Sequence, residues 1–318
     1  MTPNLKNKRT INAKLIFNPS AGAARPHPIE IVDIIHELQA HRIVPEPFLI
    51  EPGCDLDGAV KQALAKGLRL FIVCGGDGTI SAVARILAGT DATLGVIPIG
   101  TQNNVPLTFG IPDDIPAAIA LLRTGKRVKV DLATATCEKK TTTFLEGVSI
   151  GLVAELFPSV DDIQHGNLNR IGEFFKTLTS SPPAEITLFI DKKKELHNLG
   201  HVLLATNMPF IGFHYQISPA KSFRDGFLDV IYFADLTKME LLKYIFMDIG
   251  MDKPEDPRIQ HIRARKLVID TNPAMSVMAD GTVLGTGQVT LEVWHHALSV
   301  IVNPSVLLGP IISEKVTE

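Results

Sequence analysis

The chain is short of cysteine, poor in aromatic residues and free of long apolar stretches. Its 318 residues include three cysteines, Cys54, Cys74 and Cys137, too few and too scattered for a disulfide framework or a cysteine-based zinc site. We therefore expect free, mostly buried thiols and a reducing, cytoplasmic setting. No apolar run approaches the roughly 18 residues that a membrane-spanning helix needs. The mean hydropathy of +0.19 thus indicates a large core, and the polar first residues do not resemble a secretory signal.

An excess of positive charge is also absent, because the formal net charge is −3. Proteins that bind nucleic acid through electrostatics carry a basic stripe or patch, so we expect no nucleic-acid partner. The length is enough for about two domains of roughly 150 residues each. The sequence does not decide between a monomer and a homodimer.

Apolar strand-like segments alternate with helical patterns from residue 10 to residue 128. Buried strands are expected at residues 13–18, 70–74 and 94–99, and helical spacing of apolar residues lies between them, for example at 80–87. Alternating strands and helices are typical of an α/β domain with a parallel sheet. Residues 10–128 are therefore predicted to form an α/β nucleotide-binding domain with its ligand at the carboxyl ends of the strands.

The pattern changes between residues 129 and 296, where short strand-like segments are separated by turn residues. This pattern predicts a β-rich antiparallel sandwich, interrupted by helical patterns at 170–179 and 238–247. Residues of about 297–312 are expected to pack back on the first domain.

A glycine-rich loop, Gly75-Gly76-Asp77-Gly78-Thr79, stands between a buried strand and a helix. Its glycines let the backbone approach a polyphosphate, and the N-terminus of the following helix favours an anion. The loop is neither a P-loop, since no Gly-Lys-Ser/Thr ending follows, nor a dinucleotide fingerprint, whose glycines are spaced differently. A kinase that binds nucleotide phosphates through this loop is the better fit.

Asp77 is the informative residue of this loop. A carboxylate beside a phosphate is unfavourable unless it holds a metal, accepts a proton or caps the loop. The alternative is an ordinary turn in which Asp77 binds backbone amides. The sequence leaves these roles open.

Five motifs in order resemble the diacylglycerol-kinase-like lipid kinases, which include relatives of the diacylglycerol, phosphatidylglycerol and sphingosine kinases. They cover nearly the whole chain: Asn18-Pro19-Ser20-Ala21-Gly22, Gly75 to Thr79, Ile97 to Asn104, Ser218-Pro219-Ala220 with Asp225-Gly226-Phe227-Leu228-Asp229, and Ala279-Asp280-Gly281-Thr282. The resemblance implies a kinase that transfers the γ-phosphoryl group of ATP to a hydroxyl of a diacylglycerol-like lipid, reached by peripheral contact at a membrane surface.

The resemblance also implies binding sites for ATP and Mg²⁺. The ATP site would be lined by Asn18, Gly75, Gly76, Asp77, Gly78, Thr79, Ser81 and Thr101. A structural Mg²⁺ would be held by the Asp225 side chain with the backbone carbonyls of Ser222 and Phe227, oxygen ligands that suit this ion. The alternative for Asp225 is a turn residue before Gly226.

Three acidic positions of the family pattern are changed here, to Ala82, Asn104 and Thr282. Thr282 matters most, because it stands where the family has the glutamate that accepts the proton of the lipid hydroxyl. Phosphoryl transfer depends chiefly on positioning and charge neutralisation, and a general base contributes about 10²–10⁴-fold. Asp280 and Asp77 are therefore the predicted catalytic carboxylates of an enzyme with reduced activity.

Two other functions remain open. A degenerate member of the family would bind nucleotide or lipid without efficient turnover. An NAD kinase shares a Gly-Gly-Asp-Gly-Thr loop, but its usual Asn-Glu pair is not seen here.

Two basic clusters have simpler explanations than binding. His295 and His296 are adjacent on an expected strand and should point to opposite faces, which disfavours a joint metal site. Lys192-Lys193-Lys194 most simply decorates a hairpin turn, with contact to anionic lipid headgroups as the alternative.

Overall fold

The computed structural model describes residues 9–21, 29–156, 176–178, 180–191, 194–211, 215–216, 222–241 and 256–308. These residues form two compact units. The first holds the described residues up to Val130, residues 210–211 and residues 296–308; the second holds the other described residues. Two strands, β5 (Lys126–Cys137) and β17 (Val289–Val302), contribute residues to both units.

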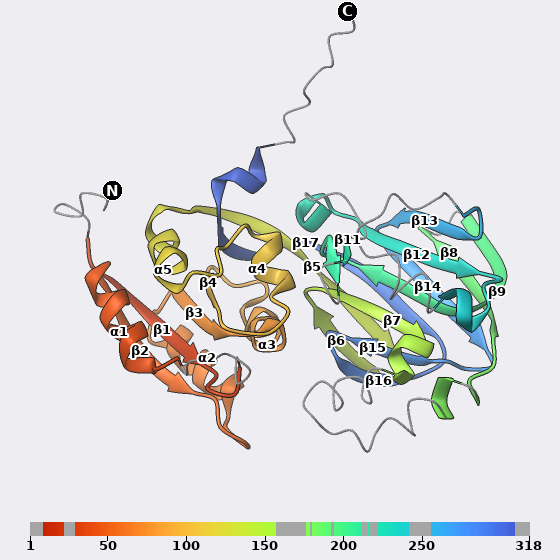
Figure 1. The fold of residues 1–318 in the computed structure, drawn as a ribbon, viewed down its shortest axis with the longest axis horizontal. Helices are drawn as coiled ribbons and strands as arrows, with labels where there is room; N and C mark the ends of the chain where they lie inside the picture. Colours follow the sequence, from red (N-terminus) through yellow and green to blue (C-terminus); the bar gives the residue numbers. More distant parts are fainter. Residues whose placement is uncertain are drawn as a thin grey trace, which may run out of the picture. The chain divides into compact units, whose positions relative to one another are not determined.

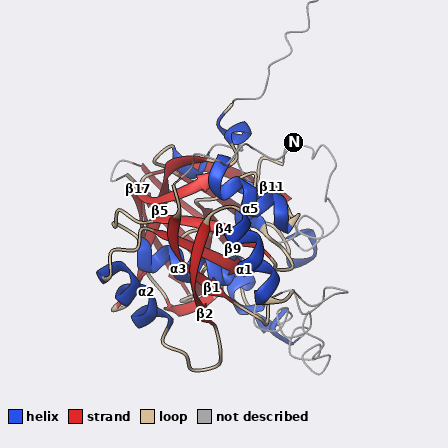
Figure 2. Ribbon diagram, turned by 90° about the vertical axis from the view of Figure 1, so that its left-hand side faces the viewer, coloured by secondary structure: helices blue, strands red, loops and turns tan. Residues whose placement is uncertain are grey.

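The first unit is a parallel sheet with helices on both faces. Its strands run in the order β2-β1-β3-β4, and the end of β17 pairs with β4 in the same parallel sense. Helices α1 and α5 cover one face, and α2 and α3 cover the other (Figures 1 and 2). The elements are β1 (Ile11–Phe17), α1 (Ile31–Ala40), β2 (Ile43–Leu49), α2 (Leu56–Ala65), β3 (Leu70–Gly75), α3 (Asp77–Leu87), β4 (Thr93–Pro98), α4 (Asn104–Thr108), α5 (Ile115–Thr124), β10 (Phe210–Ile211) and η3 (Pro304–Leu307).

The continuous apolar runs of the sequence become the central strands of this sheet. Every residue of β3 and β4 is buried, as expected for parallel strands that are covered on both faces. Helix α3 turns Ile80, Val83 and Leu87 onto the sheet, and burying such a side chain contributes about 1.5–3 kcal/mol. The predicted α/β fold is confirmed.

The second unit is built from antiparallel strands around its own apolar core. Its strands include β6 (Lys140–Phe144), β7 (Gly147–Gly151), β8 (Ala184–Ile190), β9 (Lys194–Thr206), β11 (Tyr215–Gln216), β12 (Leu228–Ala234), β13 (Ile259–Ala264), β14 (Lys266–Asn272), β15 (Ser276–Ala279) and β16 (Thr282–Thr286), with the short helix η2 (Ser222–Arg224). Strand β8 alternates buried and more exposed residues, the period of a sheet with one face on the core. The predicted β-rich antiparallel domain is confirmed.

Several predictions concern residues that the structure does not describe. The helical patterns at 170–179 and 238–247 lie mostly outside them, as do Lys192, Lys193 and the Ser218-Pro219-Ala220 motif. The predicted domain boundary lay after residue 128, and the two units divide after Val130. Of the C-terminal residues, Ser299 and Val300 pair with β4 of the first unit. Among helices in the described part of the chain, none has the length and apolar character needed to cross a membrane.

Candidate functional site

Three loops meet at the carboxyl ends of β1, β3 and β4 in the first unit. The amide of Asn18 donates to the carbonyl of Cys74 at 2.9 Å, and the amide of Ile99 donates to the carbonyl of Gly75 at 3.2 Å. These bonds hold the ends of three neighbouring strands in register. Ligands of open α/β sheets bind at this edge, where the order of the strands reverses.

Asn18 and Thr79, predicted from separate motifs, contact each other. The Asn18 side-chain amide donates from Nδ2 to Thr79 Oγ1 at 2.9 Å, and its Oδ1 accepts from the amide of Ser20 at 3.0 Å. The second bond fixes which end of the Asn18 amide faces Thr79. Since Thr79 Oγ1 accepts from Asn18, its own hydroxyl proton remains to be donated elsewhere.

Two positions of these loops have no room for a side chain. A Cβ on Gly100 would lie 2.5 Å from Gly76 Cα, and a Cβ on Gly75 would lie 2.9 Å from Thr79 Cβ. Gly78 differs, because an added Cβ there meets nothing within 4 Å. Packing within the described residues therefore explains Gly75 and Gly100 but not Gly78.

Asp77 caps helix α4 in this structure. Its Oδ2 accepts from the amide of Asn104 and its Oδ1 from the amide of Val105, both at 3.0 Å. The first-turn amides of a helix have no partner within the helix, so a carboxylate there supplies a cap and a favourable charge. Asp77 thereby ties the glycine-rich loop to the loop after β4. The family aspartate at position 104 would add a second carboxylate beside this one, whereas Asn104 adds no charge.

The two remaining predicted ATP-site residues differ in exposure. Thr101 is exposed on the loop after β4, whereas Ser81 is buried in α3, where its Oγ has no hydrogen-bond partner among the described residues. The backbone near Thr101 can therefore face a ligand directly. The buried hydroxyl of Ser81 would contact a ligand only after a local rearrangement of the structure.

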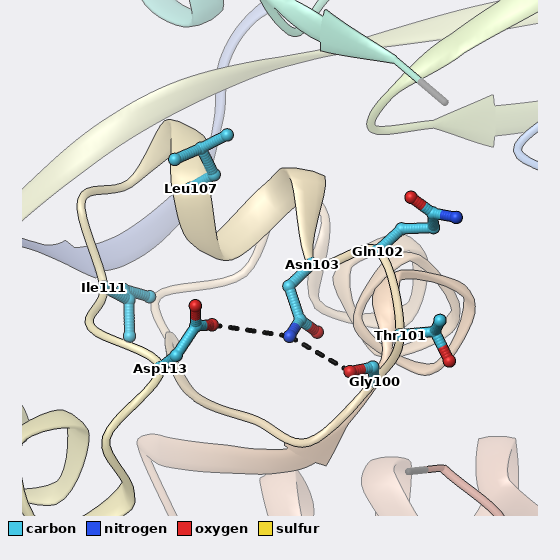
Figure 3. A pocket seen from close by; sticks show the side chains of 7 residues that line it. All are labelled: Gly100, Thr101, Gln102, Asn103, Leu107, Ile111 and Asp113. Carbon is cyan, nitrogen blue, oxygen red and sulfur yellow. Dashed lines mark hydrogen bonds between the residues drawn. The ribbon is translucent and has the colours of Figure 1, made fainter. Parts of the chain in front are cut away.

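A cavity of about 280 Å³ lies beside Thr101, and Asn103 lines it between Gly100 and Asp113 (Figure 3). Asn103 has a left-handed backbone, with φ of 55°, and donates from Nδ2 to the carbonyl of Gly100 at 3.1 Å and to Asp113 Oδ1 at 3.5 Å. Its Oδ1 is buried without a hydrogen-bond partner among the described residues. The cavity is lined by Gly100, Thr101, Gln102, Asn103, Leu107, Ile111 and Asp113.

Asp280, the other predicted catalytic carboxylate, anchors a loop of the second unit. Its Oδ2 accepts from the amide of Leu145 at 2.7 Å, and its Oδ1 accepts from the amides of Glu146 at 3.0 Å and Gly147 at 3.1 Å. A carboxylate has about four acceptor positions, and these three amides occupy most of them. Thr282 opens the following strand and is exposed.

Asp225, the predicted magnesium ligand, is bound by protein donors. Its Oδ1 accepts from the amide of Phe227 at 3.1 Å, and its Oδ2 is paired with the guanidinium of Arg263. Burial raises the pKa of Asp225; Arg263 opposes this rise, and Asp229 and Asp131 add to it. Because the guanidinium of Arg263 already places a positive charge beside Oδ2, it would repel a second cation there, so the side chain in this arrangement fits the role of an Mg²⁺ ligand poorly.

A buried carboxylate that the sequence did not single out lies beside this turn. Asp131 on β5 has no exposed surface; its Oδ2 accepts from the amide of Gly226 at 2.7 Å, and its Oδ1 lies 2.8 Å from His295 Nδ1. Gly226 has φ of 80°, and a Cβ there would lie 3.2 Å from His295 Nδ1. In addition, His296 has φ of 55°, so the strand alternation used to separate the two histidines fails at this point.

Comparison with known proteins identifies both halves of the chain. Residues 12–135 match the family model described as the diacylglycerol kinase catalytic domain, and residues 147–302 match the model of the YegS C-terminal NAD kinase beta sandwich-like domain. The chain belongs to the diacylglycerol-kinase-like lipid kinase family. The resemblance carried by the five motifs is thereby confirmed.

Relatives of this lipid kinase family match over most of their length. A diacylglycerol kinase of Bacillus subtilis is 24% identical over 277 residues, which are 85% of this chain and 89% of that protein. A diacylglycerol kinase of Mycobacterium tuberculosis is 29% identical over 234 residues, 69% of this chain and 72% of that protein. The crystal structure of a diacylglycerol kinase from Bacillus anthracis has a TM-score of 0.69 at 22% identity and covers 94% of this chain and 99% of its own. That last likeness supports the fold.

Proposed function

We propose that the chain is an ATP-dependent kinase that phosphorylates a hydroxyl of a diacylglycerol-like lipid. The observation that carries the proposal is the meeting of three loops at the carboxyl ends of β1, β3 and β4. It supports a phosphate-binding role, because it combines a helix N-terminus, closely packed glycines and an oriented hydroxyl in one place.

Thr79 and the backbone of the glycine-rich loop are the proposed phosphate ligands. Asn18 orients the Thr79 hydroxyl, whose proton can then be donated to a phosphate oxygen. Gly78 is exposed in the first turn of α3, where the absence of a side chain leaves room for a phosphate. Mg²⁺ bound with ATP would neutralise charge on the phosphates during transfer. Asp77 holds the two loops together through the amides of α4.

The proposed reaction breaks the bond between the γ-phosphorus of ATP and its bridging oxygen and forms a bond from that phosphorus to the lipid oxygen. ADP leaves, and the lipid hydroxyl loses its proton. Thr282 cannot accept that proton near neutral pH. The proposed proton acceptors are therefore the carboxylates of Asp280 and Asp77. The transition state of phosphoryl transfer is loose, so placement of the γ-phosphate matters more than the base.

A second candidate function is binding of nucleotide or lipid without turnover. Thr282 in place of the family glutamate favours it, as does the engagement of both Asp77 and Asp280 by backbone amides. In that case the loops would bind ATP, and no phosphoryl group would reach a lipid.

A labelled-phosphate assay separates the two candidates. The purified chain is incubated with γ-labelled ATP, Mg²⁺ and vesicles made from a total lipid extract, and labelled lipids are identified by mass spectrometry. A labelled phosphorylated glycerolipid supports the kinase. Measurable ATP binding with no label in any lipid would contradict the kinase and support the binding function. Dependence of the rate on vesicle surface area tests the proposed peripheral contact with a membrane.

A further inference from the structure

Carboxylates gather around the Asp-Gly-Phe-Leu-Asp turn of the second unit. Asp225 opens the turn, Asp229 on β12 follows it, and Asp131 on β5 holds the amide of Gly226. Asp225 and Asp229 both contact the guanidinium of Arg263, and Asp131 Oδ2 lies 2.7 Å from the amide of the residue after Asp225, so the three negative charges lie close together. Such a cluster needs a cation or protons to be stable.

Arg263 on β13 already supplies positive charge to this cluster. Its Nη2 pairs with Asp225 Oδ2, and its Nε lies 3.3 Å from Asp229 Oδ1. The two acidic residues of the motif are therefore bridged by one guanidinium. Strand β13 pairs with β12 so that Arg263 lies directly opposite Asp229, which places the guanidinium by backbone register.

The ring of Phe227 supports the guanidinium from the turn itself. The guanidinium carbon of Arg263 lies 4.7 Å from the centre of the Phe227 ring, and that of Arg265 lies 4.8 Å from it. Stacking on an aromatic face suits the flat, weakly hydrated guanidinium group. The position of Arg263 is thus fixed by two carboxylates and an aromatic ring.

We propose that Arg263 is the built-in cation of this turn and takes the place that the resemblance gives to a structural Mg²⁺. A guanidinium stays protonated throughout the physiological pH range, so it neutralises the turn without any bound ion. The proposal concerns the stability of the second unit and does not depend on phosphoryl transfer. The proposal does not concern the Mg²⁺ that would bind together with ATP.

Thermal unfolding without nucleotide tests the proposal on the full chain. Melting temperatures are measured in EDTA and across a series of Mg²⁺ concentrations for the wild type, Arg263→Met and Asp225→Asn. Arg263→Met removes the charge but keeps an apolar contact with Phe227. Arg265→Ala is the matched control, because Arg265, the residue between β13 and β14, stacks on the same ring.

The expected results follow from charge balance. The wild type melts at the same temperature in EDTA and in Mg²⁺. Arg263→Met melts about 2–4 °C lower in EDTA and regains stability as Mg²⁺ is added, since an ion that binds only the folded state raises the melting temperature by mass action. Arg265→Ala shows no response to Mg²⁺. Arg263→Lys, which keeps one charge but cannot bridge both carboxylates, replaces Arg263→Met if the latter does not fold.

Two outcomes would overturn the proposal. One is a wild-type melting temperature that falls in EDTA, rises with Mg²⁺ and loses this response in Asp225→Asn, which would show a true metal site. The other is an Arg263 variant with unchanged melting temperature and no Mg²⁺ response, which would show that the turn needs no cation. Failure of the kinase would appear in the lipid assay and leave these melting temperatures unaffected.

Discussion

Asp280 is expected to matter for stability, because its carboxylate binds three backbone amides that are 133 to 135 residues away in sequence. Asp280→Ala removes all three hydrogen bonds, and each contributes about 1 kcal/mol net. It also places alanine at a left-handed backbone, with φ of 41°, which costs about 1 kcal/mol more. We therefore expect Asp280→Ala to lower the free energy of unfolding by about 3–4 kcal/mol.

Asp280→Asn is the matched variant. Asparagine tolerates the left-handed backbone, and one side-chain oxygen can keep the bonds to Glu146 and Gly147. Only the bond to Leu145 is lost, so the expected decrease is about 1–2 kcal/mol. Urea unfolding followed by fluorescence of Trp294, the single tryptophan and a residue of the same unit, measures both decreases.

The same pair of variants separates anchoring from proton transfer. If Asp280 also accepts the lipid proton, fully folded Asp280→Asn protein transfers the phosphoryl group about 10²–10⁴-fold more slowly than the wild type. If it only anchors the loop, folded Asp280→Asn transfers phosphate at the wild-type rate. An Asp280→Ala protein that unfolds at the wild-type urea concentration would refute the reasoning about the three amides.

Three further predictions concern other residues. Thr282→Glu restores the family residue and should raise the rate of lipid phosphorylation by about 10²-fold or more if a general base is what the chain lacks; an unchanged rate would contradict this. Gly100→Ala places a methyl group 2.5 Å from Gly76 Cα and should cost about 1–3 kcal/mol of unfolding free energy, measured by urea unfolding; full stability would show that the loops can separate. Burial raises the pKa of Asp225, so the folded protein holds that proton more tightly than the unfolded chain does. Stability should therefore decrease as pH rises from below the ordinary value of 3.8 through the raised pKa, and Asp225→Asn should flatten this part of the pH profile; a parallel profile would contradict it.

The fold and the nucleotide loop could be predicted because their signals are local in sequence. Parallel strands buried on both faces appear as continuous apolar runs, as in β3 and β4, and the glycines stand between a strand and a helix. The contact between Asn18 and Thr79 also follows from this topology, since the loops after neighbouring parallel strands meet at one edge.

The roles of the acidic residues could not be predicted, because their partners are distant in sequence. Asp77 caps a helix that begins 27 residues later, and Asp280 binds amides more than 130 residues earlier. Asp131 looks like an ordinary polar residue of a strand until Gly226 and His295 are placed beside it. Strand alternation predicts that His295 and His296 point to opposite faces, but the left-handed backbone of His296 interrupts this alternation.

The central claim is that the glycine-rich loop binds the phosphates of ATP, and ATP binding by Gly78→Ala tests it most directly. An added Cβ at Gly78 meets no atom of the protein within 4 Å, and alanine is favoured over glycine in a helix by up to about 1 kcal/mol. Gly78→Ala should therefore keep or raise the melting temperature while weakening ATP binding, measured by calorimetry, by about 10-fold or more as the methyl group displaces a phosphate hydrogen bond. Wild-type ATP affinity in a fully folded Gly78→Ala protein would contradict the claim.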